Sequence, residues 1–237
     1  MAEKAGKIKH VGMIMDGNRR WARKHKLESV LKGHEKGGDI FMDVCTWCQD
    51  LEIPYLTVYA FSYDNFNRSE EEVSGLFLIL EDIFVRKLPV CLERDIRVVA
   101  VGNFDLLPEK TVKTLKNAME KTKHCKNLVV NIAIAYGGHD ETVRAAKKIA
   151  KDVLDGKISI DDIDMNTYTN YLDLAGCPEM DLMIRTGGDQ RLSGFFPWET
   201  SYSEFVFTDT LWPDFSKKKF EKIVKEYYDK TRVNKGK

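Results

Sequence analysis

The chain has 237 residues, 43% of them hydrophobic and 31% charged, which is typical of a soluble globular protein. Its 37 basic and 37 acidic residues give a net charge of zero, which disfavours nucleic-acid binding. No apolar stretch approaches the roughly 18 residues of a membrane span, and the polar start MAEKAGKIKH lacks the apolar segment of a signal peptide. We therefore expect a cytoplasmic protein.

Six short runs rich in β-branched and aromatic residues predict strands that are covered on both faces. In chain order they are residues 10–16, 55–61, 96–102, 128–136, 181–187 and 204–209. Helical patterns between them cover residues 35–50, 70–94, 108–123, 139–154, 166–174 and 216–229. This alternation predicts one α/β domain over residues 1–237, with a mostly parallel central sheet and helices on both faces.

The five cysteines show no disulfide framework. The stretch CTWC, residues 45–48, matches C-x-x-C but lies inside the first helical pattern. We interpret Cys45 and Cys48 as small apolar residues of a packed helix.

The first predicted strand ends at Asp16, followed by Gly17, Asn18, Arg19 and Arg20. The Asp-Gly-Asn stretch alone predicts a turn, in which Asn18 could cap a helix. The two arginines and the backbone amides of a helix start also suit an anion. Asp16 fits such a site if Mg²⁺ links it to phosphate groups. From these residues, a plain turn and a phosphate site both remain open.

Two further polar stretches follow predicted strands, and carboxyl ends of parallel strands share one edge of the sheet. In RTGGDQRLS, Arg185, Arg191 and Ser193 surround two glycines and suit either a solvated turn or a diphosphate. In FSYDNFNRSEEE, Ser69 and Glu72 predict a capping box. No such local structural role accounts for the residues before them, Ser62, Asp64, Asn65 and Arg68.

Two carboxylates, Asp16 and Glu204, are the candidate metal ligands. Neither has a histidine at metal-ligand spacing, which favours Mg²⁺ over zinc. His34, in GHEKGG, is expected at a helix start near the anion. Neither a P-loop nor a G-x-G-x-x-G motif is present, so no nucleotide cofactor is expected.

These motifs, in this order, resemble the cis-prenyltransferases, the undecaprenyl diphosphate synthase-like enzymes. The resemblance runs from HVGMIMDGNRRWA through GHEKGG, LTVYAFSYDNFNRSEEEVSGL and NIAIAYGG to IRTGGDQRLSGFFPWETSYSEFVFTDTLWPDF. It implies an enzyme that joins isopentenyl diphosphate to an allylic diphosphate such as farnesyl diphosphate, making a Z double bond. It also implies a hydrophobic tunnel, Mg²⁺, a homodimer, peripheral membrane contact at product release and a product of medium length.

The resemblance also assigns roles to residues. Asp16 and Glu204 would hold Mg²⁺, and Asp16 and Asn65 would act in catalysis, with Asn65 orienting the isopentenyl unit. The residues assigned to substrate binding are Gly17, Asn18, Arg19, Arg20, Trp21, His34, Ser62, Tyr63, Asp64, Phe66, Arg68, Arg185, Arg191, Leu192 and Ser193.

The chain departs from the family pattern at several positions. Val30 stands where bacterial members carry an arginine, with Lys26 and Lys32 as the nearest substitutes. The stretch FFPW replaces the more usual FLLW, and Arg232-Val-Asn replaces a terminal Arg-x-Gly. Two other interpretations stay open: a partner subunit of a heteromeric prenyltransferase, and a short-chain or irregular-coupling prenyl diphosphate synthase.

Overall fold

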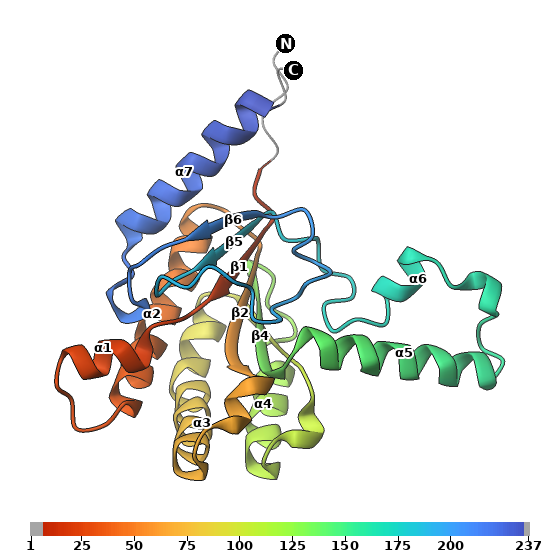
Figure 1. Cartoon of the computed structure of the whole chain (residues 1–237), viewed down its shortest axis with the longest axis horizontal. Helices are drawn as coiled ribbons and strands as arrows, with labels where there is room; N and C mark the ends of the chain where they lie inside the picture. The colour runs from red at the N-terminus through yellow and green to blue at the C-terminus, as the bar shows by residue number, and fades with distance from the viewer. Residues whose placement is uncertain (1–6, 235–237) are drawn as a thin grey trace.

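A six-stranded parallel sheet forms the centre of the computed structural model, which describes residues 7–234 (Figure 1). Its strand order is β3-β4-β2-β1-β5-β6, and all six predicted strands are present. The strands are β1 (His10–Ile14), β2 (Tyr55–Ser62), β3 (Ile96–Val101), β4 (Leu128–Tyr136), β5 (Leu182–Arg185) and β6 (Glu204–Phe207).

The strands lack alternation because helices or connecting segments cover both faces of the sheet. Every residue of β1 is buried, and β1 lies between β2 and β5. Val11, for example, pairs with Leu56 on one side and Leu182 on the other. The carboxyl ends of β1, β2, β4 and β5 therefore lie along one edge of the sheet.

The described residues form seven α-helices. They are α1 (Asn18–Lys24), α2 (Leu31–Asp50), α3 (Glu70–Glu93), α4 (Glu109–Thr122), α5 (Gly138–Leu154), α6 (Met165–Thr169) and α7 (Lys217–Asn234). Three differences from the sequence-based expectation stand out. Helix α1 was anticipated only as a possible helix start after Asp16, without bounds. Helix α2 begins at Leu31 rather than near residue 35, and the pattern at 166–174 is helical only as far as Thr169.

The first turns of α2 were missed because of their glycine content. This segment contains Gly33 and Gly37, and glycine is a poor helix former. Here close packing requires glycine: a Cβ at Gly33 would lie 2.1 Å from the carbonyl oxygen of Asn18, and one at Gly37 would lie 2.8 Å from Trp212. The two glycines thus let α2 approach α1 and Trp212 closely.

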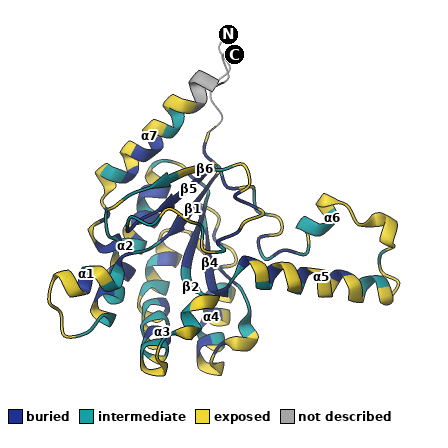
Figure 2. Ribbon diagram, viewed as in Figure 1, coloured by how far each residue is buried: buried dark blue, intermediate teal, exposed yellow. Residues whose placement is uncertain are grey.

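Helices α2, α3 and α4 pack on one face of the sheet and form the larger core. Cys45 and Cys48 are buried in this core, as expected for a packed helix. The other face is covered by a smaller cluster that includes Phe195 and Phe196 from a connecting segment. Helix α5 projects away from the sheet, and much of its surface is exposed, as is that of α6 (Figures 1 and 2). None of the helices in the described range 7–234 is long and apolar enough to cross a membrane.

Candidate active site

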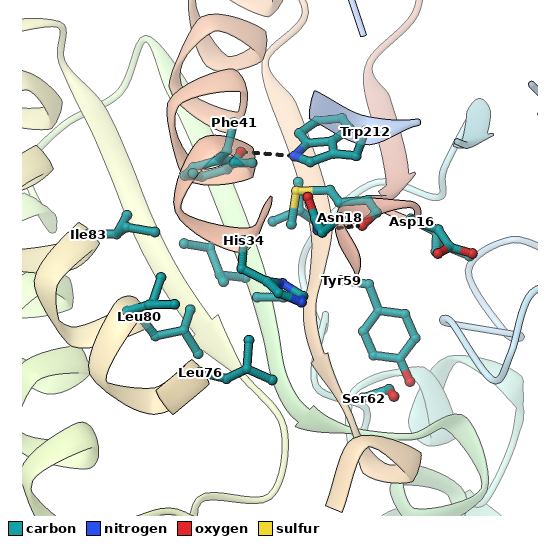
Figure 3. Close-up of a pocket in the computed structure, with 18 of the residues that line it drawn as sticks. Asp16, Asn18, His34, Phe41, Tyr59, Ser62, Leu76, Leu80, Ile83 and Trp212 are labelled. Atoms are coloured by element: carbon teal, nitrogen blue, oxygen red, sulfur yellow. Dashed lines mark hydrogen bonds between the residues drawn. The ribbon is translucent and has the colours of Figure 1, made fainter. Parts of the chain in front are cut away.

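A cavity of about 560 Å³ opens at the carboxyl edge of the sheet and continues between the sheet and helices α2 and α3 (Figure 3). Polar residues from the ends of β1, β2 and β5 and from α1 and α2 surround its mouth. The structure brings the following predicted residues to this cavity: Asp16, Gly17, Asn18, Arg19, Arg20, His34, Ser62, Asp64, Asn65, Arg68, Arg185, Arg191 and Ser193.

The interior of the cavity is largely apolar, although Lys87 of α3 also lines it. Leu76, Leu80 and Ile83 of α3 line one wall opposite Phe41 of α2, as Figure 3 shows. The lining continues along α3 to Cys91, 15 residues beyond Leu76, which corresponds to about 22 Å of helix. A long apolar slot of this kind suits a hydrocarbon chain whose charged end stays at the mouth.

The start of α1 differs from the predicted cap. Gly17, not Asn18, is the N-cap, and its φ of 112° is left-handed. A side chain at Gly17 would also meet the backbone of Leu211 at 2.9 Å, so the position favours glycine on both counts. Asn18 instead donates to the carbonyl oxygen of Met15 at 3.3 Å.

Carboxylates and guanidinium groups alternate along one side of the mouth. Arg185 Nη2 lies 3.0 Å from Asp16 Oδ2 and 3.2 Å from Asp189 Oδ2. Asp16 also pairs with Arg20 at 3.1 Å, and Asp189 with Arg191 at 2.6 Å. Arg185 is held further by Ser193 Oγ at 3.0 Å. Three arginines are thus fixed around two carboxylates, although Arg185 alone is nearly fully buried.

A second cationic group lies on the other side of the mouth, around His34. Burial, followed by the positive charges of Arg68 and Arg19, lowers the pKa of His34 to about 4. His34 is therefore neutral at physiological pH, and each ring nitrogen can serve as either a donor or an acceptor according to its tautomer.

Several buried polar atoms at the mouth have no hydrogen-bond partner among the described residues. They are Asn18 Oδ1, Arg19 Nε, His34 Nε2 and Arg185 Nε. Buried polar atoms in native proteins are nearly always paired, so this concentration around one cavity indicates a site for a polar ligand.

Side chains of the loop after β2 make local hydrogen bonds and an ion pair that the sequence analysis did not predict. Ser62 and Asn65 form a capping box around the short 3₁₀ helix Tyr63–Asn67, and Asn65 Oδ1 accepts from the backbone N–H of Ser62 at 3.1 Å. Ser69 caps α3 as predicted, but the carboxylate of Glu72 pairs with Arg68 at 3.0 Å instead of completing a capping box. The expectation that Ser62, Asn65 and Arg68 lack a local structural role was wrong.

Comparison with known proteins assigns the chain to a family. The family model described as putative undecaprenyl diphosphate synthase matches residues 14–234. The chain belongs to the cis-prenyltransferase family. This assignment agrees with the resemblance of the motifs.

Curated relatives of this prenyltransferase cover most of its length. The tritrans,polycis-undecaprenyl-diphosphate synthase (geranylgeranyl-diphosphate specific) of Thermoplasma volcanium is 42% identical over 226 residues, which is 94% of this chain and 87% of the relative. The ditrans,polycis-undecaprenyl-diphosphate synthase ((2E,6E)-farnesyl-diphosphate specific) of Micrococcus luteus is 39% identical over 224 residues, 94% of this chain and 90% of the relative. The chain is accordingly a cis-prenyl diphosphate synthase by class.

Solved structures share the fold of the prenyltransferase. The lavandulyl diphosphate synthase of Lavandula x intermedia, in complex with dimethylallyl diphosphate, matches with a TM-score of 0.90 and 35% identity over 94% of this chain and 95% of that one. A probable undecaprenyl diphosphate synthase from Campylobacter jejuni matches with a TM-score of 0.78 and 32% identity, again over 94% and 95%.

Four predicted substrate-binding residues do not line the cavity of the prenyltransferase. Trp21 donates to Asp214 Oδ1 at 2.7 Å. Tyr63 is 46% exposed, Phe66 packs against aromatic core residues, and Leu192 packs against the smaller core cluster. The assignment of these four side chains to substrate binding is thus not supported by the lining of the cavity.

Glu204 and Asp16 of the same chain lie far apart in the structure. Glu204 opens β6 and pairs with Leu182, which pairs with Val11 of β1. Asp16 follows Val11 by five residues, so the two carboxylates lie roughly 16 Å apart along the strand direction. Asp16 and Glu204 of the same chain are thus too far apart to hold one metal ion, and the assignment of Glu204 as a metal ligand stays a prediction. No group of three or more potential ligands from histidine, cysteine and carboxylate side chains occurs in the described part of the chain.

Sequence reasoning missed two charged residues that line the mouth, Arg23 and Asp189. Asp189 lies inside RTGGDQR between the two recognised arginines, so the motif already contained it. Arg23 is an exposed cation on α1, whereas Lys26 and Lys32, the suggested substitutes for a missing arginine, do not line the cavity. The expectation about Arg232 lies outside the described side chains, which end at residue 230.

Proposed function

We propose that this prenyltransferase condenses isopentenyl diphosphate with an allylic diphosphate such as farnesyl diphosphate, and repeats the reaction to make a Z-polyprenyl diphosphate of medium length. The observation that carries the proposal is one cavity that combines an arginine-rich mouth with a long apolar interior. Such a cavity suits two diphosphates at the edge of the sheet and one growing hydrocarbon tail inside.

The polar residues of the mouth form two groups that suit different substrates. The amides at the start of α1, with Arg19, Arg20 and His34, would bind the allylic diphosphate, whose tail would enter the slot beside α3. Arg185, Arg191 and Ser193 would bind isopentenyl diphosphate through charge-assisted hydrogen bonds. Asp16 lies between the two groups because it pairs with both Arg20 and Arg185.

The reaction breaks the allylic carbon–oxygen bond and forms a carbon–carbon bond to the isopentenyl unit, which then loses a proton. Negative charge develops on the departing diphosphate, and arginines already held in place by carboxylates stabilise that charge without reorganising. This preorganisation is the main contribution that the described side chains can make to the rate.

The mouth also fits Mg²⁺. Asp16 is partly exposed and faces the cavity, and Asp189 reaches the same nitrogen of Arg185. One or two carboxylates together with substrate phosphates is the environment that Mg²⁺ prefers. When bound, Mg²⁺ would supply positive charge to the diphosphate groups.

Asn65 is better placed to orient a substrate than to accept its proton. Its Oδ1 already accepts from Ser62 N–H, which leaves the Nδ2 donor for a ligand. We therefore assign the proton to an oxygen of a diphosphate, with Asn65 as a donor that positions it.

The depth of the cavity supports repeated condensation. A prenyl unit adds about 5 Å of carbon chain, so the roughly 22 Å along α3 accommodates four to five units. A product of bacterial lipid-carrier length exceeds this distance, so its tail would leave the far end of the cavity near Cys91 and Ile96. We expect such an apolar product to be released to a membrane surface.

Two alternatives are distinguishable. Irregular coupling of short units, suggested by the similarity to a lavandulyl diphosphate synthase, would not need an apolar slot of this depth. A non-catalytic partner subunit would not need Asp16, Arg185 and Arg191 together at one mouth, and this chain has all three there. Both features favour the elongating enzyme.

We also propose a homodimer that uses the edge of the sheet at β6. An edge strand exposes unpaired backbone groups, and aromatic side chains gather here: Tyr202 is 88% exposed and Phe205 39% exposed. Light scattering at micromolar concentration tests this, and a stable, fully active monomer would contradict it.

The decisive experiment is incubation of the purified protein with labelled isopentenyl diphosphate, farnesyl diphosphate and Mg²⁺, followed by chromatography of the products. Elongated Z-prenyl products support the proposal. A parallel reaction with dimethylallyl diphosphate alone tests irregular coupling, and absence of any product from either reaction favours the partner-subunit interpretation.

A further inference from the structure

Glu72 contacts two cationic side chains that reach the cavity mouth from different elements. Its Oε1 accepts a hydrogen bond of 3.0 Å from Arg68 Nη1 and lies 3.4 Å from Arg19 Nε. Arg19 belongs to α1, whereas Arg68 lies two residues before the first residue of α3. A single carboxylate oxygen therefore connects the first helix to the helix that walls the apolar slot.

The surroundings of Glu72 make it the main counter-ion of this side of the mouth. Burial lowers the pKa of Arg68, the negative charge of Glu72 opposes that effect, and Arg19 lowers the pKa further, whereas Asp16 acts on Arg68 more weakly. His34, beside them, is neutral and is itself affected by both arginines. Without Glu72, neither guanidinium group would have a carboxylate oxygen within 4 Å among the described residues.

Glu72 occupies only part of each guanidinium group. Arg68 uses Nη1 for this contact, and Arg19 approaches through Nε, whose geometry is not that of a hydrogen bond. In the part of the chain that the structure describes, the remaining N–H groups of these two side chains make no hydrogen bond with protein atoms. Each arginine thus keeps donors for a ligand while its position is restrained.

We propose that Glu72 is a positioning residue for the allylic diphosphate. It holds Arg19 and Arg68 at a separation at which both can donate to one diphosphate, and it joins that pair to the first turn of α3. Long cationic side chains lose freedom on binding an anion, and a restraint present beforehand reduces that loss. One negative charge against two positive ones leaves the pair cationic, so attraction to a diphosphate remains.

The test compares Glu72→Ala and Glu72→Gln with a matched control, Glu71→Gln. Glu71 lies in the same helical turn, is exposed, and makes no ion pair with any described residue. Kinetics are measured with farnesyl diphosphate and isopentenyl diphosphate varied in turn. Calorimetric titration with inorganic pyrophosphate and the thermal midpoint of each variant complete the set.

We expect Glu72→Ala to raise the KM for farnesyl diphosphate roughly tenfold or more, which corresponds to the loss of about one charge-assisted hydrogen bond. The KM for isopentenyl diphosphate should stay unchanged. Pyrophosphate should bind more weakly in parallel. Glu72→Gln keeps an oxygen acceptor of similar size and should recover part of the loss. Glu71→Gln should behave as the wild type.

Several results would overturn this role. One is an equal rise in both KM values together with a lower thermal midpoint, which indicates a purely structural residue. Another is tighter binding of the allylic substrate or of pyrophosphate by Glu72→Ala, which indicates that the carboxylate opposes the diphosphate. Because this role presupposes the proposed function, the wild type is assayed first. If it forms no prenyl product, the proposed function fails, and the pyrophosphate titrations alone decide the role of Glu72.

Discussion

Val98 lies deep in the apolar cavity, and replacing it with phenylalanine should limit product growth. Val98 pairs with Val130 of β4, and Val130 pairs with Leu56 of β2. Leu56 comes six residues before Ser62 at the mouth, so Val98 lies about 20 Å from the mouth. At about 5 Å per prenyl unit, a farnesyl tail reaches roughly 15 Å, and one further unit reaches Val98.

The expected size of the effect follows from packing. A tail that passes the added phenylalanine overfills the space beside β3, which costs about 1–3 kcal/mol. This cost slows each addition that moves the tail past residue 98 by roughly 5- to 150-fold. The first condensation should keep its rate, and products with one or two added units should accumulate. Val98→Ala widens the same place and should lengthen the products. Reversed-phase chromatography of labelled products measures both distributions.

Val99→Phe is the matched control, because Val99 is the next residue of β3 and packs against the smaller core cluster on the other face of the sheet. It should leave the product distribution unchanged. If Val99→Phe shortens the products as much as Val98→Phe, the effect comes from damage to β3. If Val98→Phe leaves the distribution unchanged while the first condensation is intact, the tail does not run along this wall.

Asp16→Ala should lower the rate roughly a thousandfold, and chelation of Mg²⁺ should abolish wild-type activity; full activity in excess chelator would contradict the metal assignment. Arg191→Ala should mainly raise the KM for isopentenyl diphosphate and Arg20→Ala should mainly impair use of the allylic substrate, each through a loss of about 1.5–3 kcal/mol; swapped effects would refute the two-site assignment. Ala60→Leu should crowd each passing tail, so shorter products should accumulate while the first condensation survives, and an unchanged distribution in the same chromatographic assay would count against this. Burial, followed by nearby carboxylates, raises the pKa of Glu199 from 4.5 to about 8, so the folded protein binds this proton more tightly than the unfolded chain. The free energy of unfolding should therefore fall as the pH rises from about 4.5 to about 8, and denaturant titrations should show that Glu199→Gln removes part of this fall.

The sheet and the location of the site were predictable because both depend on local patterns. Buried parallel strands appear as short apolar runs, and their carboxyl ends must share an edge. The polar stretches after β1, β2 and β5 therefore identified most of the mouth. Helix α1 was harder to predict, because its seven residues include three arginines and a lysine and show little apolar periodicity.

The errors at single residues have physical causes. Glu204 was assigned as a metal ligand by resemblance and is not an error of this kind: the predicted strand at 204–209 places it at an amino end, so one chain does not bring it to Asp16. The capping box of Ser62 and Asn65 escaped notice because asparagine, rather than glutamate or glutamine, occupies its third position. The contacts of Glu72 depend on how α1 approaches α3, and no local pattern encodes that approach.

The apolar slot also has a volumetric consequence. Space that protein atoms do not fill is lost when a chain unfolds, so hydrostatic pressure favours the unfolded state of a protein with large internal voids. The cavity of about 560 Å³ should make the free protein sensitive to compression. A growing tail fills that space, so resistance to pressure should rise with the first one or two units added to a farnesyl tail and should then stay level, because the slot is full and further units extend beyond it.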